Sequence, residues 1–279
     1  MSLPKTLTTA LILGSALLVG SCAEDISPAV TPTVDGTGLG HIHGLGLDSG
    51  DNSLYVATHL GLMQVDQSGR PNRVADRYQD TMAFAVLGPG HFLASGHPDL
   101  REDLPAHLGL IESTDAGATW TPLALQGEAD FHILEPAGEA LYAYDAVSGR
   151  LLRTTDRETF DEVYRGPLIS VATVGETASL YATDGNGRLL LIDARSGEAR
   201  QLGGPTMVYL DITPEGALAG VDPAGVVRVS TDAGRSWRDG GSIAGPPAAF
   251  TITDQGWYAA SETGVYRSSD EGVTWSRVL

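Results

Sequence analysis

Two histidines alternate with apolar residues in the segment HIHGLGLD, residues 41 to 48. In a strand, side chains two positions apart lie on one face about 6.6 Å apart, which is close enough to share a cation. Imidazole combined with a thioether suits copper better than magnesium or calcium, and imidazole also suits zinc. The sequence therefore predicts a copper or zinc site, with these candidate ligands: His41, His43, His132, Met82 and Met207.

Other polar side chains gather in segments that are expected to surround the same strand, above all in the insertion GHPDLREDLPAHLGL, residues 96 to 110. The candidate ligand-binding residues are His59, Tyr78, His97, Arg101, Glu102, His107 and Tyr209. Three carboxylates could supply the acid and base of a glycoside hydrolase, namely Asp80, Asp99 and Asp130. A third interpretation is an interaction or assembly scaffold, in which the histidines bond to backbone groups and seal a channel.

A repeated motif indicates the elements that must position these residues. The pattern S-x-D-x-G-x-[ST]-W occurs at residues 113–120, 230–237 and 268–275, with a degenerate copy at 154–160. Serine and aspartate can accept local backbone N–H groups across a tight turn, and glycine takes the positive-φ position. We assign a structural role to the aspartate and the tryptophan that recur in the three full copies: Asp115, Trp120, Asp232, Trp237, Asp270 and Trp275.

Short strands recur with a period of about 40 residues, and no long helical period interrupts them. Units open near His41, Met82, Asp130, Leu168, Met207 and Ala248. This spacing predicts an all-β domain over residues 41–279, a six-bladed β-propeller with four strands per blade; a junction placed differently would give five or seven blades. In an alignment of the six innermost strands, we expect the first and third positions to face the channel.

The three repeats match the Asp-box, or BNR, motif. Together with HIHGLGLD, RYQDTMAF, SGHPDLREDLPAHLGLIESTD and EADFH they make residues 41–279 similar to secreted bacterial Asp-box proteins labelled glycosyl hydrolase or exo-sialidase-like. The resemblance implies a sialidase-type propeller whose ligand site lies on the face opposite the boxes, and it keeps a glycan or glycosidase role open. Sialidases hold their substrate with three arginines, whereas the expected rim offers Arg77 and Arg101. We therefore do not expect sialidase activity.

The N-terminus predicts where the protein works. One lysine precedes an apolar run that is too short to span a bilayer, so residues 1–21 are typical of a secretory signal peptide. The segment LVGSC resembles a bacterial lipobox, which implies lipidation of Cys22, and residues 22–40 are typical of a flexible tether. We expect a bacterial lipoprotein outside the cytoplasm that contacts the membrane through its lipid alone.

Composition narrows the ligands further. The chain has 17 basic and 35 acidic residues, a net charge of -18, which disfavours nucleic acid and favours cations. Its single cysteine excludes an intramolecular disulfide and a thiolate metal site in the domain. The sequence identifies no protein partner.

Overall fold

The computed structural model describes residues 38–66, 68–173 and 178–279. The predicted signal peptide 1–21, Cys22 and residues 23–37 of the predicted tether lie outside the described residues. Within the described ranges, no helix has the length and hydropathy required to cross a membrane. One short 3-10 turn, η1 (Val74–Asp76), accompanies the strands.

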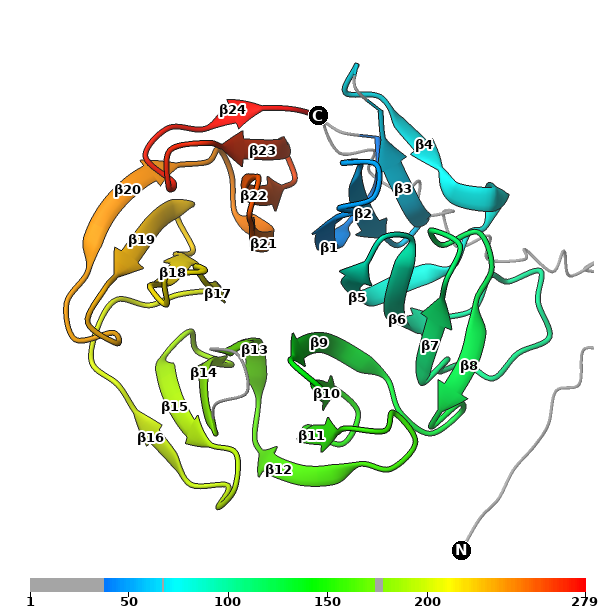
Figure 1. The fold of residues 1–279 in the computed structure, drawn as a ribbon, viewed down its shortest axis with the longest axis horizontal. Helices are drawn as coiled ribbons and strands as arrows, with labels where there is room; N and C mark the ends of the chain where they lie inside the picture. Colours follow the sequence, from blue (N-terminus) through cyan, green and yellow to red (C-terminus); the bar gives the residue numbers. More distant parts are fainter. Residues whose placement is uncertain (1–37, 67, 174–177) are drawn as a thin grey trace, which may run out of the picture. The chain divides into compact units, whose positions relative to one another are not determined.

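Six four-stranded antiparallel sheets form a ring, and each is built from consecutive strands (Figure 1). Blades one to three contain β1 (Ile42–Leu47), β2 (Leu54–Thr58), β3 (Gly61–Val65), β4 (Pro71–Arg73); β5 (Asp80–Gly88), β6 (His91–His97), β7 (Leu110–Ser113), β8 (Thr121–Ala124); β9 (Phe131–Ala137), β10 (Ala140–Asp145), β11 (Arg150–Thr154), β12 (Asp161–Arg165). Blades four to six contain β13 (Leu168–Thr173), β14 (Ser179–Asp184), β15 (Leu189–Asp193), β16 (Ala199–Gln201); β17 (Tyr209–Ile212), β18 (Leu218–Val221), β19 (Val226–Ser230), β20 (Arg238–Ser242); β21 (Pro247–Thr253), β22 (Gly256–Ser261), β23 (Gly264–Ser268), β24 (Ser276–Arg277). The predicted six-bladed β-propeller is confirmed.

The first strand of each blade faces the centre of the ring and packs against the first strands of the neighbouring blades. Contact between β1 and β21 closes the ring. Apolar side chains of blades one and six share a single buried cluster there, with Ile42 and Val56 on one side and Ala249 and Val265 on the other. Burial of apolar surface between blades therefore closes the propeller.

The repeat turns, residues 113–120, 230–237 and 268–275, have the same hydrogen bonds. In the first, the Asp115 carboxylate accepts the Ser113 hydroxyl (2.8 Å) and the Thr119 N–H (2.8 Å), and the Ser113 hydroxyl accepts the Gly117 N–H (2.8 Å). Gly117 has a φ of +83°, as the motif predicts. Equivalent bonds form around Asp232 and Asp270.

The register of blade two places this turn and the 98–109 loop at opposite ends of the blade. Ser113, which begins the first repeat turn, pairs with Phe92 at the start of β6. His97, after which the loop begins, ends β6 and pairs with Asp80 at the start of β5. The loop and the repeat turn therefore lie on opposite faces of the ring, as expected.

The expected alternation along the inner strands holds only in part, because the third positions line the channel cavity and the first positions do not. Five of the six inner strands contain a register shift near their first residues. The extra residue in each strand is, in chain order, His43, Met82, His132, Ile169 and Ala248. A β-bulge interrupts the two-residue period, so positions that look equivalent in the sequence do not share a face. Leu168 and Met207, expected at the channel, are buried in the core instead. Phe84 and Phe250 are largely buried but line the channel cavity, as expected.

Candidate functional site

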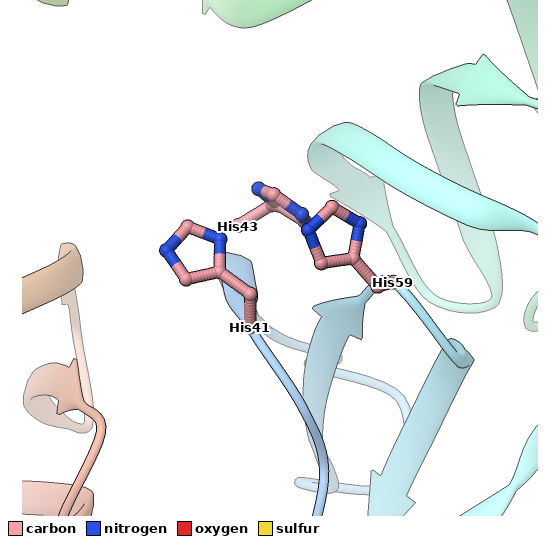
Figure 2. A group of neighbouring side chains, drawn as sticks. All are labelled: His41, His43 and His59. Atoms are coloured by element: carbon pink, nitrogen blue, oxygen red, sulfur yellow. The ribbon is translucent and has the colours of Figure 1, made fainter. Parts of the chain in front are cut away.

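His41, His43 and His59 form a first histidine cluster at the start of blade one (Figure 2). One ring nitrogen of each lies within 4.8 Å of the others. The ring centroids of His41 and His43 are 4.8 Å apart, and those of His43 and His59 are 4.3 Å apart. His59, predicted only as a general ligand-binding residue, thus lies beside the two predicted metal ligands.

Local backbone structure explains this convergence. His43 is the bulge residue of β1, and His59 lies in the turn between β2 and β3, where its N–H donates to the His41 carbonyl (3.2 Å). The Thr58 hydroxyl holds the turn by donating to the Gly61 carbonyl (2.8 Å). Gly61 has a φ of +112°, and a Cβ there would lie 2.3 Å from the Arg77 carbonyl oxygen, so the turn requires glycine.

Asp80 lies against this cluster. Its Oδ1 is 2.8 Å from His59 Nδ1 and 3.7 Å from His43 Nε2. The shorter contact is not aligned as a hydrogen bond, and both Asp80 Oδ1 and His43 Nε2 are buried without a hydrogen-bonding partner. Burial, followed by repulsion from His59 and His41, lowers the pKa of His43 to about 3. At neutral pH the His43 imidazole is therefore uncharged, which is the form that binds metals.

A second histidine cluster consists of His97, His107 and Asp130, whose ligating atoms also lie within 4.8 Å of one another. His97 ends β6, His107 lies in the 98–109 loop, and Asp130 directly precedes β9. His132, the bulge residue of β9, lies 3.1 Å from Asp130 Oδ2 through its Nε2. The structure therefore divides the predicted single site of His41, His43 and His132 between two clusters on neighbouring blades.

Side chains around Asp99 hold the 98–109 loop in place. Asp99 accepts the Tyr78 N–H (2.9 Å) and pairs with the Arg101 guanidinium (2.6 Å). Arg77 pairs with Glu102 (2.8 Å). Hydrogen bonds from Arg101 and Tyr78 hold the pKa of the Asp99 carboxyl well below its usual range. These polar residues therefore stabilise the conformation of the loop. Because Asp99 is engaged in these contacts, it is not free to act as a catalytic acid.

The predicted carboxylates for glycoside hydrolysis have other partners. Asp80 lies among the histidines of the first cluster and Asp130 among those of the second. Burial raises the pKa of Asp130, but the hydrogen bond from His132 and the nearby His97 and His107 outweigh it and lower the pKa overall. A general acid needs the opposite shift, towards neutral pH.

The two predicted methionine ligands differ in position. Met82 is the half-buried bulge residue of β5. Met207 is fully buried in an apolar cluster with Leu189, Leu210 and Leu218. Met207 is therefore a core residue, because the strand on which it was placed begins only at Tyr209.

The channel contains a cavity of about 390 Å³ whose lining includes His43, His132, Glu135, Tyr209 and Asp211. Burial raises the pKa of Glu135 to about 8, with a further contribution from Asp211, and burial raises the pKa of Asp211. Burial also raises the pKa of Tyr209. The sequence analysis did not predict the Glu135 and Asp211 carboxyl groups. The signal that could have found them is an acidic residue within an apolar inner strand, Glu135 in β9 and Asp211 in β17.

Comparisons with known proteins identify the fold alone. No protein-family profile and no curated protein matches the sequence. A gluconolactonase from Xanthomonas campestris has a TM-score of 0.65 at 12% identity, over 81% of this chain and 85% of that one. A chain of a nidogen/laminin complex has a TM-score of 0.59 at 12% identity, over 77% and 88%. YCF48 bound to a D1 peptide has a TM-score of 0.51 at 15% identity, over 85% and 81%.

Proposed function

We propose that the protein binds a transition-metal ion, Cu(II) or Zn(II), through His41, His43 and His59 at the mouth of the propeller channel. It does so outside the bacterial cytoplasm, tethered to the membrane by lipidated Cys22. The observation that supports this function is the convergence of three imidazoles around two buried polar atoms, His43 Nε2 and Asp80 Oδ1, that lack hydrogen-bonding partners. Each such atom costs about 1–3 kcal/mol, and a bound cation would remove that cost.

The dimensions of the cluster suit such an ion. Metal–nitrogen bonds of about 2.0–2.1 Å place two ligands of a tetrahedral shell about 3.4 Å apart. His43 Nε2 and Asp80 Oδ1 are 3.7 Å apart, and the ligating nitrogens of the three imidazoles lie within 4.8 Å of one another. Asp80 can complete the shell or orient His59. A net charge of -18 favours the approach of a cation.

The ligand set accommodates more than one metal. The sequence favours copper partly because of its predicted thioether ligands, but Met207 is buried elsewhere. Three imidazoles suit both zinc and copper, and Cu(II) binds a given nitrogen site more tightly than Zn(II). We therefore expect both ions to bind, copper with the higher affinity.

Calorimetric titration of the full-length protein, after removal of metals with a chelator, tests the function. His43→Ala should weaken the binding of one Cu²⁺ by at least about 100-fold, and Asp80→Asn by about 10-fold, the usual scale for a residue that orients ligands. His91→Ala is the matched control, because His91 lies at the far end of β6 and pairs with Glu112 (2.8 Å). Wild-type copper affinity in His43→Ala would contradict the proposal.

A further inference from the structure

The second histidine cluster has its own converging geometry. Three imidazole nitrogens face a single carboxylate oxygen, Asp130 Oδ2: His132 Nε2 at 3.1 Å, His97 Nε2 at 3.9 Å and His107 Nδ1 at 3.9 Å. The Asp130 side chain is only 9% exposed. The two longer separations exceed hydrogen-bonding distance, so His97 and His107 do not donate to this carboxylate.

A hydrogen bond outside the cluster fixes the orientation of the His97 ring. His97 Nδ1 is 2.8 Å from the Ala106 carbonyl oxygen, which can only accept, so Nδ1 carries the hydrogen. The other ring nitrogen, Nε2, is the one that lies towards Asp130 Oδ2 (3.9 Å). A metal ion bound to Nε2 would leave the bond to Ala106 in place, and such a bond commonly orients a histidine ligand.

The backbone of Asp130 is fixed independently of its side chain. Its N–H donates to the buried Asp145 carboxylate (3.2 Å), and the Phe131 N–H donates to the Ser95 hydroxyl (3.1 Å). Even so, Asp130 Oδ1 and His107 Nδ1 are buried without a hydrogen-bonding partner. Buried polar atoms without a partner require an explanation, and a bound ion is one that imidazole and carboxylate side chains fit.

We propose that His97, His107 and Asp130 bind a second divalent first-row metal ion, with His132 orienting the Asp130 carboxylate. This set of two imidazoles and a carboxylate differs from the all-imidazole first cluster, and its donors suit Zn(II), Fe(II) or Mn(II). The two sites adjoin, since Asp80 beside the first cluster pairs with His97 of the second across β5 and β6. The channel mouth therefore offers two neighbouring metal sites.

Equilibrium dialysis of the full-length protein against Zn²⁺ tests this inference. We expect two bound ions in the wild type, one in Asp130→Asn, one in His43→Ala and none in the double variant. His107→Ala should also bind one ion; it alters a partly exposed loop residue, so it covers the case in which Asp130→Asn fails to fold. Unchanged thermal unfolding of each metal-free variant shows that loss of zinc is not loss of the fold.

Each remaining outcome is decisive. Two ions in both Asp130→Asn and His107→Ala, or a single wild-type ion that every substitution abolishes, would overturn the second site. A single ion lost only in His43→Ala would also overturn it and leave the proposed function standing. A single ion lost only in Asp130→Asn and His107→Ala would support the second site and contradict the proposed function.

Discussion

Replacement of Glu135 by glutamine should make the protein more stable at alkaline pH. The carboxyl lines the channel cavity with Asp211, and burial followed by repulsion from Asp211 raises its pKa from 4.5 to about 8. Between these pH values the unfolded chain loses the Glu135 proton while the folded chain keeps it. Folding stability therefore falls as pH rises through this window, and it levels off above the folded-state pKa.

The expected magnitude follows from that pKa. A change from 4.5 to about 8 corresponds to at most about 5 kcal/mol above pH 8. Solvent screening and relaxation of the folded protein reduce this value, so we expect Glu135→Gln to gain about 1–3 kcal/mol at pH 9. At pH 5 the glutamine resembles the protonated acid and still accepts the Thr173 N–H, which is 3.0 Å from Glu135 Oε1. Because pH 5 is close to the ordinary pKa of 4.5, the two proteins should there differ by only about 1 kcal/mol or less.

Urea unfolding at pH 5 and pH 9, with a chelator present, measures this difference. Glu139→Gln is the matched control, because Glu139 is exposed in the hairpin that ends the same strand. The other titratable groups of the cavity, His43, His132, Tyr209 and Asp211, are present in both variants. Asp211 loses a charged neighbour in Glu135→Gln, which acts in the same direction as the expected gain at pH 9. A stability difference between wild type and Glu135→Gln that is the same at both pH values would refute the reasoning.

Three further predictions concern packing and turns. Gly46→Ala should destabilise the protein by about 1–3 kcal/mol in urea unfolding, because the new Cβ would lie 2.8 Å from the buried Phe84 ring; an unchanged midpoint would contradict the tight inter-blade fit. Asp115→Ala should lower the melting temperature through loss of three turn hydrogen bonds, while calorimetry should show unaltered copper binding. Asp99→Ala should accelerate limited proteolysis in the 98–109 loop by releasing Arg101, and a wild-type cleavage rate would show that this ion pair does not hold the loop.

Much of the fold could be predicted because it depends on local chemistry. The repeat turns need serine, aspartate and glycine at fixed offsets, because these side chains bond to the backbone N–H groups of the turn. The motif can therefore be recognised in the sequence. Their phase, with the period of the apolar strands, predicted six blades. The resemblance to Asp-box propellers implied that the 98–109 loop lies opposite the turns, as the register of blade two has it.

The composition of the candidate site was decided by tertiary structure. Bulges at His43 and His132 depend on how each inner strand pairs with its neighbour, and no local pattern in the sequence marks them. Met207 shows the same limit, because its burial depends on where β17 begins. The sequence by itself determined which histidines gather at one end of the ring. Only the tertiary structure, through strand register and loop contacts, decided that they form two clusters around two different carboxylates.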